Sequence, residues 1–152
     1  MLVDLARNDL SRSGNNVKVE KNREIQFYSH VIHLVSKVTA TLKEGIKSYQ
    51  VVEDTFPAGT LSGAPKHKAL ELIEKYEKVN RNFYGGAIGF IDFSGNFNHA
   101  IIIRSFFSKN NILNYQAGAG IVIDSDPEKE LEEVQNKLGA LDKALIEAEL
   151  IK

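Results

Sequence analysis

The sequence contains no cysteine, and its formal net charge at pH 7 is only −1 over 152 residues. The missing cysteine excludes disulfide frameworks and thiolate metal sites. A net charge close to zero argues against a protein that binds nucleic acid or a membrane surface without specificity. The longest apolar stretches, around residues 100–103 and 117–123, are far too short to span a bilayer. The first residues carry charged side chains instead of the apolar segment of a signal peptide, so we expect a cytoplasmic protein.

The amino-acid composition is otherwise ordinary for a globular protein, because 43% of the residues are hydrophobic and 26% are charged. A chain of 152 residues is about one domain, long enough to bury a sizeable core. Apolar residues recur at helical spacing over 1–10, 64–79 and from 127 onward, and more weakly over 46–54. Alternating or β-branched segments predict strands over 17–27, 29–42, 84–93, 97–107 and 112–123. These elements predict an α+β fold in which helices pack on an antiparallel β-sheet and the last three strands form a meander.

The stretch Phe56–Lys66, FPAGTLSGAPK in one-letter code, runs directly into the predicted helix over 64–79. Gly59 and Gly63 permit close approaches that a Cβ would forbid, and Pro65 suits the first position of a helix. The stretch predicts a tight loop whose hydroxyls and free backbone N–H groups lie at a helix N-terminus, which suits an anionic ligand. A plain helix-entry loop explains the same composition, and the spacing is not that of a Walker A phosphate loop.

Two polar side chains fall on predicted apolar faces. Arg104 shares a strand face with apolar neighbours, and an unpaired guanidinium buried there would cost roughly several kcal/mol. It therefore forms a structural ion pair or binds a carboxylate through its planar fork. His33 is either a hydrogen-bonded core residue or a general acid/base. The remaining histidines do not complete a recognisable zinc-binding spacing.

Two further groups of residues have both a structural and a functional interpretation. Glycines within predicted strands, at 85–86 and 118–120, mark either close sheet-to-helix packing or a close approach to a ligand. Glu130, Glu133 and Lys137 lie on one flank of the last predicted helix. They form either a solvated face with a Glu133–Lys137 pair or a source of carboxylates for a hard cation such as Mg²⁺.

Together these segments resemble the chorismate-binding enzymes, in the form seen in component I of anthranilate synthases. The core of the loop, Ala-Gly-Thr-Leu-Ser at 58–62, is of the anthranilate type; aminodeoxychorismate synthases more often show Gly-Gly-Ser-Ile-Thr there. The other matching segments keep the family's order: MLVDLARNDL at 1–10, SHVIHLVS at 29–36, YGGAIG at 84–89, IIIRS at 101–105, QAGAGIV at 116–122 and the segment 124–137. The resemblance covers essentially the whole chain and implies the α+β fold of these enzymes.

The resemblance implies a role in substrate binding for several residues. Arg104 and Tyr84 would hold the carboxylate of the enolpyruvyl group of chorismate. The backbone around Gly118 and Gly120 would meet a substrate carboxylate, with Lys137 nearby.

The resemblance also implies catalytic and metal-binding residues. Thr60 would contact the substrate within its loop, and His33 would assist proton movement and the elimination of pyruvate. Glu133 would bind Mg²⁺, with Glu130 as its acidic neighbour. The metal would chelate the ring carboxylate and stabilise charge that develops as the C4 hydroxyl leaves.

The reaction implied is that of a lyase in tryptophan biosynthesis: chorismate and ammonia give anthranilate and pyruvate, with ammonia supplied by a glutamine amidotransferase subunit. Aminodeoxychorismate or salicylate/isochorismate synthesis on the same fold, and an inactive truncated chorismate-binding module, are the alternatives. The family's catalytic domain is longer, and its first magnesium-binding Glu and its Pro-Ile-x-Gly-Thr segment precede the matched region. We therefore expect residues 1–152 to be the C-terminal part of a chorismate-binding catalytic domain, inactive and poorly soluble alone because core-facing sheet edges would be exposed.

Overall fold

The structure, a computed structural model, describes residues 2–28 and 32–151. Within these residues it contains four helices and three two-stranded sheets, which confirms the predicted α+β class. The chain divides into two compact units. The first comprises residues 1–76 and 89–99, and the second comprises residues 77–88 and 100–152.

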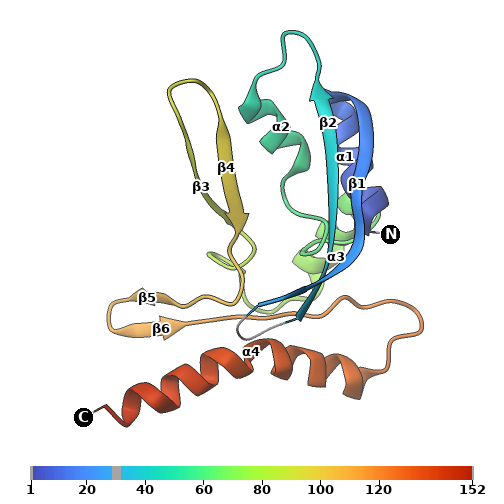
Figure 1. Ribbon diagram of the computed structural model, residues 1–152. Coiled ribbons are helices and arrows are strands. Elements are labelled where there is room, and N and C mark those ends of the chain that lie inside the picture. The colour runs from blue at the N-terminus through green and yellow to red at the C-terminus, as the bar shows by residue number, and fades with distance from the viewer. Residues whose placement is uncertain (1, 29–31, 152) are drawn as a thin grey trace. The chain divides into compact units, whose positions relative to one another are not determined.

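The first unit is built around a long strand pair (Figure 1). Strands β1 (Gly14–Phe27) and β2 (Ile32–Leu42) are antiparallel, in a register that runs from Gly14 opposite Leu42 to Phe27 opposite Ile32. Helix α1 (Leu2–Ser13) packs against both strands and against helix α2 (Ser48–Thr55). Helix α3 (Lys66–Tyr76) follows the loop of residues 56–65. The four predicted elements before the loop and the helix after it are therefore present.

The second unit contains a small hairpin and the last helix. Strands β5 (Phe107–Lys109) and β6 (Ile112–Asn114) are joined by Asn110 and Asn111, whose φ angles of 53° and 60° are those of a two-residue hairpin turn. Helix α4 (Pro127–Glu149) begins as its sequence predicts, because the Asp126 side chain accepts a hydrogen bond from the Lys129 N–H. The boundary between the units runs through the paired strands β3 (Ala87–Ile91) and β4 (Phe97–Ile101).

The predicted three-stranded meander is wrong in its extent. Strand β4 ends at Ile101, and Arg104 just beyond it has a φ of 51°, a left-handed conformation that cannot continue a strand. Strand β6 has only the three residues of β5 to pair with, so the third predicted strand ends at Asn114. Residues 115–123 consequently form no strand. Gly118 and Gly120 therefore lie in irregular chain, outside any strand.

The expected sizeable core is also absent from the part of the chain that the structure describes. There, Leu141 is the one hydrophobic side chain classed as buried, at 9% exposed. The strand pair β1–β2 leaves large apolar side chains open to solvent, among them Ile25, Phe27, Ile32 and Leu34. The buried polar side chains described are Asp9 and Ser13, both on α1. None of the described helices is long and apolar enough to cross a membrane.

Candidate functional site

A pocket of about 350 Å³ lies in the first unit, and a larger one of about 1180 Å³ opens in the second. Tyr84 and Arg104, both predicted to bind one carboxylate of the substrate, line the larger pocket. Residues of β5 and β6 and the following Tyr115 and Gln116 complete much of its wall. Two side chains that lie 20 positions apart in the sequence are thus brought to the same pocket by the fold.

Arg104 does not lie where its strand pattern predicted. It is exposed and follows the end of β4, so its interpretation as a guanidinium buried on an apolar strand face is wrong. Its left-handed backbone is uncommon for a residue other than glycine and costs about 1–3 kcal/mol. Strain of this kind is concentrated at binding and catalytic sites. The position of Arg104 on the pocket wall favours the interpretation as a carboxylate-binding residue.

Tyr84 is half-buried, with Arg81 near its ring and Gly118 near its hydroxyl group. The Arg81 guanidinium lies 5.6 Å from the centre of the Tyr84 ring, and two hydrogen bonds from Arg81 to Glu77 fix that guanidinium. The hydrogen-bonded Glu77 carboxylate raises the pKa of Arg81 above its ordinary value. At the hydroxyl end of Tyr84, a Cβ added to Gly118 would lie 3.5 Å from the hydroxyl oxygen. The phenol therefore lies next to the backbone of the glycine segment that was predicted to meet the substrate.

Lys137 connects the glycine segment to helix α4. Its ammonium donates a hydrogen bond of 2.8 Å to the Gly118 carbonyl and forms an ion pair with Glu133 one helical turn earlier. Glu130, on the same flank of α4, accepts a hydrogen bond of 2.6 Å from the Ser125 hydroxyl. The second unit thus brings together the predicted substrate-binding and metal-binding residues Tyr84, Gly118, Lys137, Glu133 and Glu130.

The acidic pair on α4 fits a magnesium ion only as part of a ligand set. Among residues 2–28 and 32–151 no group of three or more His, Asp or Glu side chains is placed to hold a metal. Mg²⁺ usually takes one or two carboxylates from a protein and fills its other positions with water and substrate oxygens. Glu130 and Glu133 supply hard oxygen ligands of this kind, and the Glu133 side chain is 52% exposed and accessible to a ligand. The donor chemistry therefore fits.

His33 and Thr60 belong to the first unit, whereas the other predicted site residues belong to the second. His33 is half-buried on β2, and its ring contacts that of Tyr28 edge-on with centroids 5.5 Å apart. Thr60 is exposed in the loop between α2 and α3. Their catalytic roles stay predictions.

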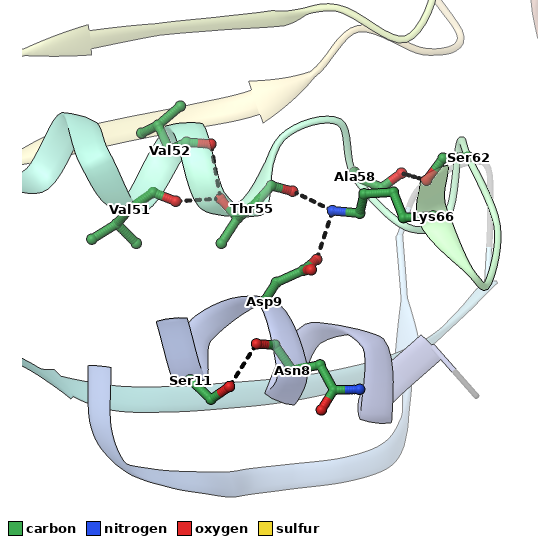
Figure 2. Close-up of polar contacts among 9 residues, drawn as sticks. All are labelled: Asn8, Asp9, Ser11, Val51, Val52, Thr55, Ala58, Ser62 and Lys66. Atoms are coloured by element: carbon green, nitrogen blue, oxygen red, sulfur yellow. Dashed lines mark hydrogen bonds and ion pairs between the residues drawn. The ribbon is translucent and has the colours of Figure 1, made fainter. Parts of the chain in front are cut away.

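The end of the loop differs from its prediction. Helix α3 begins at Lys66, and the Pro65 carbonyl accepts the first helical hydrogen bond from the Ala69 N–H, so Pro65 precedes the first helical position. The Lys66 ammonium pairs with Asp9 at 2.7 Å and donates to the Thr55 carbonyl at 3.2 Å (Figure 2). No role was predicted for Lys66. The signal was its charge, because a lysine in the first turn of a helix opposes the helix dipole and needs a compensating partner.

Comparison with known proteins relates the chain to one family, to a relative of similar sequence and to two solved structures. The profile of a family described as "chorismate binding enzyme" matches residues 1–143. Anthranilate synthase component 1 of Aquifex aeolicus is 50% identical over 151 residues, which cover 98% of this chain and 31% of the relative. The crystal structure of anthranilate synthase component I from Streptococcus pneumoniae superposes with a TM-score of 0.82 at 41% identity, over 90% of this chain and 32% of that one.

A protein from Bacillus anthracis described as a 2,3-dihydroxybenzoate-specific isochorismate synthase superposes with a TM-score of 0.85 at 29% identity. The match covers 95% of this chain and 39% of that chain. The chain thus spans about 31% of the length of its Aquifex aeolicus relative. The isochorismate synthase shares the fold as closely as the anthranilate synthase component does, with fewer identical residues.

Proposed function

The chain belongs to the family of chorismate-binding enzymes, and from this premise we propose that it is part of an anthranilate synthase component 1. The observation that carries the proposal is the 50% identity to the Aquifex aeolicus component over 98% of this chain. The lower identity to the isochorismate synthase, 29% against 41% for the Streptococcus pneumoniae component, argues against isochorismate synthesis. In this proposal residues 1–152 are the C-terminal part of the catalytic domain.

The substrate proposed is chorismate, which carries two carboxylates. Arg104 and Tyr84 offer a guanidinium and a phenol hydroxyl on the wall of one pocket, and together they suit one carboxylate. The backbone at Gly118 and Gly120 is open to the other carboxylate, because a Cβ at either position would have at most one neighbour within 4 Å. Lys137 lies beside this segment through its hydrogen bond to the Gly118 carbonyl, which brings a positive charge to the same place.

Proton transfer and elimination of pyruvate are assigned to His33 and contact with the substrate to Thr60. These assignments rest on the family's motifs, with the half-buried ring of His33 as the structural support for a titratable group held in place. Glu133, with Glu130 beside it, would hold Mg²⁺, which when bound would supply positive charge at the ring carboxylate. In the structure the Glu133 carboxylate forms an ion pair with the Lys137 ammonium.

The proposal includes a partner and a place in metabolism. The relatives are named component 1, which agrees with a second component, and we propose a glutamine amidotransferase subunit that supplies ammonia. The product anthranilate would enter tryptophan biosynthesis in the cytoplasm. No residue described in the structure is assigned to contact with that subunit.

The test uses a chimera in which this chain replaces the 151 matched residues of the Aquifex aeolicus component 1. The chimera is incubated with chorismate, Mg²⁺ and ammonium, and anthranilate is followed by its fluorescence. We expect anthranilate from the chimera and none from the isolated 152-residue chain. Chorismate consumption without anthranilate, in a chimera that is folded by circular dichroism, would contradict the proposal.

A matched pair of variants then tests the pocket. Arg104→Gln removes the guanidinium proposed to bind chorismate, and we expect KM for chorismate to rise about tenfold or more, as for loss of a charge-assisted bidentate contact. Arg23→Gln is the control, because Arg23 is also exposed and also has a left-handed backbone, with a φ of 55°, yet lies outside the pocket. An equal effect of the two substitutions would refute the assignment of Arg104.

A further inference from the structure

One face of helix α1 holds the loop of residues 56–65 and its two flanks. Leu5, Asp9 and Ser13 are spaced by one helical turn each, so they lie on the same face of α1. Ser13 donates a hydrogen bond to the Asp54 carboxylate just before the loop, and Asp9 accepts one from Lys66 just after it. Between these anchors, a Cβ added to Gly59 would lie 2.2 Å from a methyl carbon of Leu5, so the loop backbone packs closely on the helix.

The polar anchors on α1 are buried, which makes them unusual in this chain. Ser13 is 2% exposed and Asp9 is 9% exposed, and they are the two buried polar side chains in the described parts of the chain. The side chains of the ion pair between Lys66 and Asp9 are 18% and 12% exposed. A charge so poorly hydrated needs its partner, because the water that would otherwise stabilise it is largely excluded.

Lys66 also joins the two ends of the loop to each other. Its ammonium donates to the carbonyl of Thr55, the last residue of α2, while Lys66 itself is the first residue of α3 (Figure 2). The Thr55 carbonyl is one of those that a helix leaves without a partner at its C-terminus, where a positive charge is favourable. The ammonium is therefore turned away from the N-terminus of its own helix, toward the negative end of α2 and the Asp9 carboxylate.

We propose that Lys66 and Asp9 are positioning residues that close the base of the loop and hold Thr60 in place for the substrate. The contact of Lys66 with Asp9 and the Thr55 carbonyl is called the clamp below. Its consequence for catalysis rests on the function proposed above, whereas the clamp itself does not. Neither residue is assigned a contact with chorismate. Their ion pair joins residues 57 positions apart in the sequence, so it fixes the loop relative to α1 and not merely within itself.

The test compares Lys66→Met with Lys68→Met in the chimera. Lys68 is the matched control, because it lies in the same helix and pairs with Glu71 but is 64% exposed. Hydrogen exchange is measured for the amides of residues 56–65, including Leu61, whose N–H bonds to the Ala58 carbonyl. We expect Lys66→Met to accelerate exchange in this loop by about tenfold or more and to leave the β1–β2 amides unchanged, as in local opening. Equal exchange in both variants overturns the clamp.

Steady-state kinetics distinguish positioning from a general loss of folded enzyme. A displaced Thr60 should raise KM for chorismate by about tenfold while KM for ammonium stays the same, since misplacement of a contact is felt by the substrate that it touches. A fall in kcat that only matches the loss of folded chimera by circular dichroism, with unchanged KM for chorismate, overturns the positioning role, because that result reports fewer active molecules. Lys66→Arg, which keeps the charge, should give loop exchange and KM between those of the wild type and Lys66→Met.

The two proposals fail in different ways. If the folded chimera with the wild-type chain consumes chorismate without forming anthranilate, the proposed function is contradicted, and hydrogen exchange still tests the clamp. If anthranilate forms and neither Lys66→Met nor Asp9→Asn alters loop exchange or KM, the clamp is contradicted and the proposed function stands.

Discussion

Alanine at Gly118 tests whether a ligand approaches the glycine segment. The added Cβ would have one neighbour within 4 Å, the Tyr84 hydroxyl oxygen at 3.5 Å, which is an ordinary van der Waals contact. The φ of Gly118 is not in the left-handed region, so alanine adopts this backbone without strain. Replacing glycine at such a site stabilises a protein by about 0.4–1 kcal/mol, because the unfolded chain has less conformational entropy to lose.

The same methyl group would stand where a substrate carboxylate is proposed to meet the backbone. We therefore expect Gly118→Ala to leave the melting temperature of the chimera unchanged or slightly raised while KM for chorismate rises about tenfold, or about 1.4 kcal/mol in binding. Gly139→Ala is the control, because a Cβ there has no neighbour within 4 Å and lies on α4, away from the glycine segment. It should raise the melting temperature without altering KM. An unchanged KM in Gly118→Ala would refute the proposed approach of substrate to this segment.

Three further predictions concern the fold and its ionisation. Gly59→Ala should destabilise the chimera by about 1–3 kcal/mol through its clash with Leu5, and Leu5→Ala should relieve part of that loss. Additive effects of the two substitutions, in a double-mutant cycle measured by denaturation, would contradict the contact. Asp126→Ala should lower the thermal stability by about 1 kcal/mol, because the Lys129 N–H loses its cap; an unchanged melting curve would contradict this. The hydrogen bond from Tyr115 to Asp142 stabilises the neutral phenol and raises its pKa, so Asp142→Asn should lower the pH at which tyrosinate absorbance appears, relative to a Tyr115→Phe reference.

The parts of the fold that could be predicted are those decided by neighbouring residues. The cap of α4 by Asp126 depends on a side chain and a backbone N–H three positions apart. The hairpin turn at Asn110 and Asn111 depends on the ease with which asparagine adopts a left-handed backbone. In both places a short stretch of sequence contains the whole interaction, so neighbouring residues are enough to predict it.

The strand lengths could not be predicted in the same way. Apolar residues continue from β4 through Ile103, but pairing stops because the backbone turns at Arg104 and the next strand, β5, is only three residues long. Where a strand ends depends on which partner strand is within reach. The fold decides this, and the alternation of apolar and polar residues in the sequence does not. The predicted core failed for the same reason, since a hydrophobic composition buries surface only where another element covers it.

The candidate site, too, could be predicted only in part. The resemblance to the chorismate-binding enzymes assigned residues 84, 104, 118 and 137 to carboxylate binding, and the structure gathers these residues in one unit. The clamp of Lys66 on Asp9 was missed because its two residues are 57 positions apart, and the charge of Lys66 in the first turn of its helix does not identify its partner. Only the fold reveals that their side chains meet in a poorly hydrated place.

Product analysis of the chimera tests the central claim most directly. The chimera is given chorismate, Mg²⁺ and ammonium labelled with heavy nitrogen, and the products are separated and identified by mass spectrometry. We predict anthranilate that carries the labelled nitrogen, with pyruvate released in equal amount. Unlabelled isochorismate or salicylate, or labelled aminodeoxychorismate in place of anthranilate, would contradict the account.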